Sequence, residues 1–296
     1  MEYTYILTTD SDAEMPASWL EELDIKAILM PYTLDGTEYF FDFFREIDDK
    51  HFFQQMRDGA KVTTAQRNPE DFKEFWEPWL KEGKDILYVG LSSQLSGTFN
   101  SANVAKAELS EVYPDRKILL VDSLSISMPE AMVVRVAAEK RLAGASIEEA
   151  AAAAEAVAKR STALFMVDDL EYLKRGGRVS ATAAFFGGML DIKPVLYISP
   201  SGKLEPLLKI KGNKKAMRTM AELCAKCAAD PQESHMVICQ ADCEEQAEVF
   251  EGMIREKVAP KSLHTQAVGP VIGSHCGPGT LAICFFANCD DLADMV

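Results

Sequence analysis

The stretch "ILYVGLSSQLSGTFNSA", residues 86–102, joins three patterns that together indicate one class of fold. Residues 86–90 form an apolar, β-rich run, residues 91–97 carry small hydroxyl side chains, and a helix-like segment follows. A short apolar strand that ends in a polar loop and leads into a helix is the repeating unit of α/β proteins. The hydroxyl-rich loop should therefore lie at the carboxyl end of a strand.

Similar apolar runs recur along the chain and alternate with longer helical patterns. We predict strands at residues 3–8, 86–91, 117–121, 163–167, 195–199, 236–240 and 281–286. Helix signals fill the gaps: Asn68 can cap a helix that begins at Pro69, and Ser146 with Glu149 forms a capping box before an alanine-rich run. The alternation predicts an α/β fold with substantially parallel sheets.

The pattern changes near Arg160, where a segment marked by glycine and arginine begins. At 296 residues, the chain suits two domains of ordinary size. We predict an N-terminal α/β domain at residues 1–160, which carries the hydroxyl-rich loops, and a C-terminal α/β domain at residues 161–296. No low-complexity linker separates them, so a cleft between the two is a natural ligand site.

The charge and the N-terminal sequence argue against two classes of partner. A formal net charge of −15 disfavours sequence-independent binding to nucleic acid and to anionic membrane surfaces. The start, MEYTYILTTDSD, lacks a basic region followed by an apolar core, and no window reaches about 18 uninterrupted apolar residues. We expect a cytoplasmic protein that binds no nucleic acid and is not stably inserted in a membrane.

The seven cysteines all lie in the C-terminal third of the chain. Their odd number, without a secretory signal, argues against a disulfide framework and favours reduced thiols. Cys224 and Cys227 form a CxxC pair, with His235, Cys239 and Cys243 nearby, which raises the alternative of a zinc site. Because the pair sits in a helix-like stretch without a glycine or proline knuckle, we favour small residues packed on a helix face and predict no metal.

The hydroxyl-rich loop favours an anionic or strongly polar ligand group. The helix that follows a strand presents free N–H groups, Ser93 and Ser96 add hydroxyl donors, and Gly97 allows a close approach to a ligand. The loop contains neither the GxxxxGK[ST] motif of nucleotide-binding loops nor the GxSxG motif of hydrolases. Small hydroxyls without a cation suit a single carboxylate; the alternative is that they only cap the helix and satisfy a turn.

Other polar segments support a ligand site. Thr63 and Thr64 precede the capped helix in what we expect to be a loop, and two further predicted strands end in the polar runs 8–12 and 122–127. In the second half, Arg178 follows a glycine pair. His275 lies between glycines on an expected loop before a strand, where rigid backbone often carries function, although an ordinary hydrogen-bonded histidine is the alternative.

At these segments the chain resembles the DegV family of bacterial fatty-acid-binding proteins. The resemblance spans nearly the whole chain and rests on "ILTTDSDAEMP", "SSQLSGTFNSA", "VDSLSISM", "DDLEYLKRGGRVS", "LDIKPVLYI" and "GSHCGPGTLAI", in that order. It implies two α/β domains of DegV type, the first with a largely parallel sheet flanked by helices and the second with a mixed sheet. It also implies one buried long-chain fatty acid, and a separate ATP-dependent kinase that phosphorylates the carboxyl to an acyl phosphate for phospholipid synthesis.

The resemblance also implies roles for individual residues. Thr64 matches the carboxylate-binding threonine, with Ala65 where serine is usual, and Ser93 or Ser96 matches the loop serine, of which we favour Ser96 beside Gly97. Arg178 and His275 match the family's arginine and histidine on the side of the site that faces the phosphate and the kinase. We expect the fatty-acid tunnel to be lined by Phe185, Phe186 and Met189. Pro129 and Lys211 depart from the residues that are usual in the family, and these departures put the pairing with a kinase in question more than lipid binding.

Three functions remain open from the sequence. The first is a binding protein that presents a fatty acid to a kinase and has no cofactor or complete catalytic machinery of its own. The second is a phosphotransferase or hydrolase in which His275 acts beside Arg178. The third is a carrier or sensor of another amphipathic acid, without a kinase.

Overall fold

The computed structural model describes residues 3–45, 48–178 and 192–296. The strands are β1 (Tyr5–Asp10), β2 (Ile25–Ile28), β3 (Pro31–Leu34), β4 (Thr37–Phe40), β5 (Val62–Thr64), β6 (Asp85–Gly90), β7 (Ile118–Asp122), β8 (Ser161–Met166), β9 (Ile192–Ile198), β10 (Leu204–Lys211), β11 (His235–Gln240), β12 (Ser262–Ala267) and β13 (Leu281–Phe286). The α-helices are α1 (Ala17–Glu22), α2 (Asp49–Arg57), α3 (Pro69–Lys81), α4 (Thr98–Val112), α5 (Met128–Leu142), α6 (Ile147–Ala158), α7 (Leu170–Gly176), α9 (Asn213–Cys227), α10 (Glu244–Lys257) and α11 (Pro270–Cys276). Within these residues, none of the helices combines the length and the apolar character that crossing a membrane requires.

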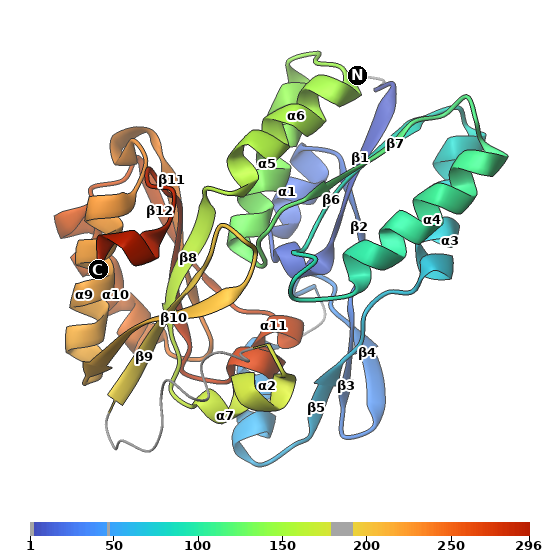
Figure 1. Cartoon of the computed structure of the whole chain (residues 1–296). Helices are drawn as coiled ribbons and strands as arrows, with labels where there is room; N and C mark the ends of the chain where they lie inside the picture. Colours follow the sequence, from blue (N-terminus) through green and yellow to red (C-terminus); the bar gives the residue numbers. More distant parts are fainter. Residues whose placement is uncertain (1–2, 46–47, 179–191) are drawn as a thin grey trace.

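The first sheet is parallel and has the strand order β2-β1-β6-β7. Its two faces are covered by different helix pairs, α3 with α4 on one side and α5 with α6 on the other (Figure 1). Strand β6 follows this division, since Ile86 and Tyr88 join the cluster under α3 and α4, whereas Leu87 and Val89 join the opposite one. A strand buried on both faces reads as a continuous apolar run, which is why the sequence identified it.

A small antiparallel sheet, β4-β3-β5, extends from the same half of the molecule (Figure 1). Strand β4 is exposed along its whole length. Strand β5 pairs with β3, so that Thr64 lies opposite Tyr32. The expected loop at Thr63 and Thr64 is therefore wrong: these residues form a short strand, because the polar, half-exposed segment finds its hydrogen-bond partners in β3 rather than in its own turn.

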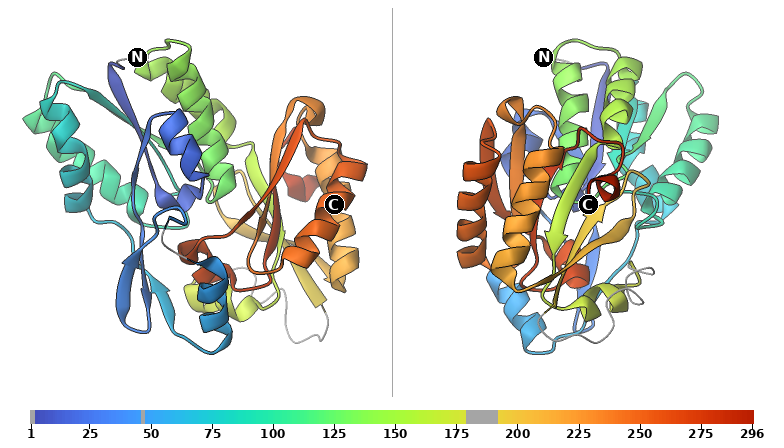
Figure 2. Two further views of the ribbon diagram at one scale, coloured as in Figure 1. Left: turned by 180° about the vertical axis from the view of Figure 1, so that it is seen from behind. Right: turned by 60° about the vertical axis from the view of Figure 1, so that its left-hand side comes forward.

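The third sheet is mixed, with the order β10-β9-β8-β13-β11-β12. All of its pairs are antiparallel except β11 with β12. Helices α9 and α10 pack on its outer face (Figure 2). Along β8 the side chains alternate, with Leu164 and Met166 toward these helices and Ala163 and Phe165 toward the first half of the molecule. The observed α/β architecture, with a parallel N-terminal and a mixed C-terminal sheet, confirms the predicted fold class.

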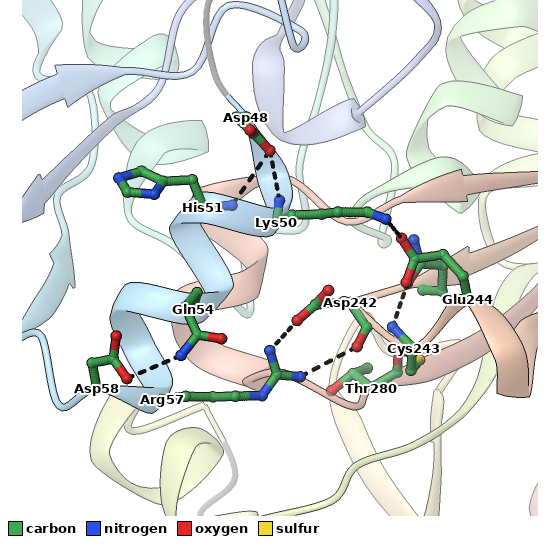
Figure 3. Close-up of polar contacts among 11 residues, drawn as sticks. Asp48, Lys50, His51, Gln54, Arg57, Asp58, Asp242, Cys243, Glu244 and Thr280 are labelled. Carbon is green, nitrogen blue, oxygen red and sulfur yellow. Dashed lines mark hydrogen bonds and ion pairs between the residues drawn. The ribbon is translucent and has the colours of Figure 1, made fainter.

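Helix α2 ties the two halves together on one side of the molecule. Lys50 Nζ lies 2.8 Å from Glu244 Oε1, and Arg57 pairs with the carboxylate and the backbone carbonyl of Asp242 (Figure 3). On the buried side of the same helix, Phe53 packs against α11 at Gly273. The Phe53 contact packs α2 against α11, and α11 forms part of the cavity described below.

The predicted strands and helix caps agree with the structure to within a few residues. Both capping boxes form: Asn68 with Asp71 at α3, and Ser146 with Glu149 at α6. Among the described residues, every strand before Arg160 lies in the first two sheets, and every later strand lies in the third. The largest apolar cluster includes residues from both sides of this point, so the division into two domains near Arg160 stays a prediction.

Candidate functional site

An apolar cavity lies between the carboxyl ends of the first sheet and the inner face of the third. The space that holds no atoms amounts to about 950 Å³, including the part open to solvent. The first sheet contributes the residues that follow β1, β6 and β7, and α11 contributes Val271, Ile272, His275 and Cys276.

Small side chains on the inner face of the third sheet leave room for this cavity. Ala163 of β8, Cys239 of β11, and Ala282 and Cys284 of β13 all line it and are all buried. The Sγ atoms of Cys239 and Cys284 are 3.8 Å apart. On the opposite face, the same strands carry large side chains that pack against α9 and α10. The sheet is thus closely packed on one side and hollow on the other.

The polar residues that line the cavity include Thr64, Ser96 and His275. The Thr64 hydroxyl hydrogen-bonds Nε2 of His275 at 2.8 Å. The Ser96 hydroxyl contacts the Thr98 hydroxyl at 2.9 Å and accepts a hydrogen bond from the Thr98 backbone N–H at the start of α4. Thr64 and Ser96, predicted from segments about thirty residues apart, therefore face one space.

His275 is neutral at pH 7. Burial, with a smaller contribution from the Arg178 guanidinium, lowers the pKa of His275 to about 4. Its Nδ1 atom is buried and has no hydrogen-bond partner among the described residues. A Cβ at Gly176 would come within 2.2 Å of that atom, so the ring packs directly against the glycine of α7.

The position of His275 corrects the sequence analysis in one respect. The residue lies on α11 rather than on a loop. Pro270 occupies the first turn of this short helix, and Gly277 ends it with a φ of +77°. A proline at the start and a glycine after the end are typical helix boundaries, and the expectation of a loop came from interpreting the glycines around His275 as loop signals.

Arg178 lies between the cavity and a second hollow on its outer side. Its Nε donates to the Leu95 carbonyl at 3.2 Å, and its Nη1 donates to the Gly176 carbonyl. The outer hollow shares Thr64, Arg178 and His275 with the cavity and is also lined by Lys61 and Arg175. These cationic side chains form a local concentration of positive charge in a chain whose formal net charge is −15.

Ser93 and Gly97 do not line the cavity. Ser93 is exposed, and its backbone N–H donates to the Asp122 carboxylate. A Cβ at Gly97 would lie 2.0 Å from Oε1 of Gln66, so this glycine makes room for the Gln66 side chain, which reaches Ser101. The predicted tunnel residues Phe185, Phe186 and Met189 lie outside the described residues.

The cysteines of the CxxC pair are core residues. Cys224 and Cys227 are both fully buried on α9, and Cys224 Sγ lies 3.9 Å from Met236 Sδ. Burial raises the pKa of Cys227 to about 11. Across the described residues, no group of three or more histidine, cysteine or acidic side chains is arranged to hold a metal ion.

A group of buried carboxyls lies beside the cavity, which sequence reasoning did not identify as a site. It consists of Asp10, Asp12 and Glu14 at the end of β1, and Glu130 of α5. Asp10 accepts hydrogen bonds from the Tyr88 hydroxyl and the Leu91 N–H, and Glu14 accepts them from Ser127 and from the Gly269 N–H. Of the group, Asp12 lines the cavity. The signal in the sequence was the run TTDSD, which we noted only for its polar character.

Comparison with known proteins gives one consistent result. Residues 5–288 match the family model described as "Uncharacterised protein, DegV family COG1307". The chain is 39% identical to a DegV domain-containing protein of Clostridium perfringens over 96% of this chain and 98% of the relative. It is 34% identical to one of Streptococcus pyogenes over 95% and 97% of the two chains.

Solved structures with the same fold include proteins described as binding fatty acids. A fatty-acid-binding DegV family protein of Thermus thermophilus superimposes with a TM-score of 0.86 at 29% identity, over 96% of this chain and 99% of that one. The fatty-acid-binding DegV of Bacillus subtilis gives 0.82 at 29% identity, over 96% and 99%. A DegV lipid-binding protein of Thermotoga maritima gives 0.83 at 30% identity, over 96% and 99%.

Proposed function

This chain belongs to the DegV family, and from that membership and the shape of its cavity we propose that it binds one long-chain fatty acid, whose carboxylate is held by Thr64 and Ser96. The single observation that carries the proposal is the apolar cavity whose lining includes Thr64 and Ser96. The structures of relatives described as binding fatty acids support the ligand class.

The hydrocarbon chain supplies most of the affinity in this proposal. Burying about 15 methylenes at roughly 0.8 kcal/mol each gives on the order of 12 kcal/mol of gross driving force. A charge-assisted hydrogen bond contributes only about 1.5–3 kcal/mol, and removing water from the carboxylate offsets part of that. The tail therefore determines whether the ligand binds, and the hydroxyls determine which way its carboxylate points.

We expect Ser96→Ala and Thr64→Val each to weaken fatty-acid binding roughly tenfold, because each removes one hydrogen bond to a charged group. Thermal stability should change little, since both side chains are only half-buried. Titration of delipidated protein with a fluorescent fatty acid measures the effect. Ser93→Ala is the comparison variant, and a larger loss from it than from Ser96→Ala would contradict the choice of Ser96.

We further propose that a separate ATP-dependent kinase phosphorylates the bound carboxylate to an acyl phosphate. The cationic outer hollow supports this step, because Lys61, Arg175 and Arg178 are suited to a phosphate group on the outer side of Thr64 and His275. Because hydroxyl groups and no lysine would hold the carboxylate, it would also remain nucleophilic. Purified protein with ATP alone should form no acyl phosphate, and adding a bacterial fatty acid kinase should produce it.

The geometry favours this binding role over a hydrolase that uses His275. A general base at neutral pH needs a pKa near that pH, and burial holds the pKa of His275 at about 4. Among the described residues, no carboxylate bonds its Nδ1 atom to orient the ring. We therefore assign His275 to positioning the Thr64 hydroxyl.

Native mass spectrometry of the purified protein, followed by denaturing extraction, tests the ligand class directly. We expect a retained mass of a few hundred daltons that is released on denaturation and identified as a fatty acid. Extraction of a different amphipathic acid would favour a carrier or sensor of that compound. A ligand-free protein that also fails to bind added fatty acid would contradict the proposed function.

A further inference from the structure

Asp12 is a buried acid, one of whose carboxyl oxygens has no hydrogen-bond partner among the residues that the structure describes. Its side chain is 3% exposed, and its Oδ1 atom is buried without a hydrogen-bond partner among the described residues. Its backbone is well fixed, since its N–H donates to Asp10 Oδ1 at 3.1 Å and its carbonyl accepts from the Ser127 N–H at 2.8 Å. The backbone of Asp12 is therefore fixed while its buried Oδ1 atom goes without a hydrogen bond from the described residues, which is costly for a buried polar group.

This side chain belongs to the lining of the same cavity as the proposed head-group ligands, Thr64 and Ser96. The preceding residue, Ser11, bonds the N–H of Met30, which lies next to the strand that pairs with Thr64. Asp10 bonds the N–H of Leu91, at the start of the loop that carries Ser96. The two residues before Asp12 are thus bonded to Met30, which precedes the strand paired with β5, and to Leu91, which begins the loop that carries Ser96.

We propose that Asp12 is a third head-group ligand of this cavity, whose protonated carboxyl donates a hydrogen bond to the carboxylate of the bound fatty acid. This inference rests on the proposed function and adds a residue to it. One proton is shared between two carboxyl groups, and no bond to carbon or phosphorus changes. Two carboxyls in contact share a proton because two adjacent negative charges in a buried site repel each other.

The surroundings of Asp12 keep it protonated in the absence of ligand. Burial, and then the charges of Asp10 and Glu14, raise the pKa of Asp12 well above its usual value. Arg178 opposes this shift more weakly. The other titratable groups near it are Glu130 of α5, whose pKa burial also raises, and Tyr88 of β6, which is bonded to Asp10. The neutral His275 of α11 lines the same cavity.

The proposal predicts that ligand affinity falls when Asp12 loses its proton. The probe is sodium decanoate, titrated by calorimetry into delipidated wild-type protein between pH 6 and pH 10. We expect affinity to fall at the alkaline end by up to tenfold per pH unit. Asp12→Asn keeps a hydrogen-bond donor without a titrating group, so it should bind decanoate at pH 6 within about threefold of the wild type and lose this pH dependence.

Glu130→Gln is the matched control, because Glu130 is an equally buried member of the same carboxyl group that does not line the cavity. It should keep the wild-type pH profile. A wild-type affinity that stays constant over the range, or an Asp12→Asn profile that falls as the wild type does, would overturn the role of Asp12. The wild-type titration gives this answer even if the variant does not fold. Absence of decanoate and longer-chain binding at every pH would instead contradict the proposed function itself.

Discussion

We expect Ala282→Leu to weaken the binding of hexadecanoic acid roughly a hundredfold, because the new side chain takes the place of about three methylenes worth roughly 0.8 kcal/mol each and obstructs the rest of the chain. Ala282 is buried on β13 and faces the cavity. In the ligand-free protein, the leucine enters unfilled space and buries apolar surface. We therefore expect the free energy of unfolding of delipidated Ala282→Leu to equal or exceed that of the wild type.

Ala221→Leu is the matched control for this experiment. Ala221 lies on α9 in the closely packed cluster on the other face of the third sheet and is fully buried. Adding the same atoms there should destabilise the protein by about 1–3 kcal/mol, since a filled core cannot accept them without strain. Fatty-acid affinity should be unchanged. If Ala282→Leu destabilised as Ala221→Leu does, with no loss of affinity, the cavity would not be the binding site.

The sequence was most informative where burial is most complete. Strands β1, β6, β8 and β13 are buried nearly throughout, and such strands appear as uninterrupted apolar runs of limited length. The strands that we missed are exposed or mixed in character. Strand β4 is exposed along its length, β12 is mostly polar, and β10 contains a proline at an edge of its sheet. In these strands, hydrogen-bond pairing with a neighbouring strand determines the structure, although the local sequence pattern indicates a strand only weakly.

The polar lining of the cavity could be predicted in part, and the apolar lining could not. The family resemblance singled out Thr64 and Ser96, and both of them line the same cavity. By contrast, an alanine or cysteine within a strand fits tight packing as well as it fits an empty space. The small residues Ala163, Cys239 and Ala282 acquire their meaning only when three strands bring them to one face. The run that contains Asp12 likewise fits an ordinary polar turn, and only the structure shows that its Oδ1 atom is buried without a hydrogen-bond partner among the described residues.

We expect the protein to lose stability as the pH rises from 6.5 to 8.5, because its buried carboxyls must give up protons. Burial raises the pKa of Glu14 to about 8, against a usual value of 4.5. A group whose pKa is higher in the folded state stabilises the fold fully below its unfolded pKa, and that stability is lost as the pH rises toward the folded value. Between pH 6.5 and pH 8, Glu14 alone should cost about 2 kcal/mol of unfolding free energy.

The pH window and the variants isolate this effect. Below pH 6.5 the lowered pKa of His275 works in the opposite direction, because the unfolded chain then binds a proton that the folded protein does not. Above pH 6.5, exposed carboxylates are already ionised in both the folded and the unfolded state.

Glu14→Gln keeps the shape and polar contacts of the protonated acid, so urea unfolding should show a flatter pH dependence and higher stability than the wild type at pH 8. Glu22→Gln removes a negative charge at an exposed position and should leave the wild-type slope intact. An equal slope in Glu14→Gln and the wild type would mean that Glu14 is ionised in the folded protein, with its charge stabilised by the Ser127 hydroxyl and the Gly269 N–H.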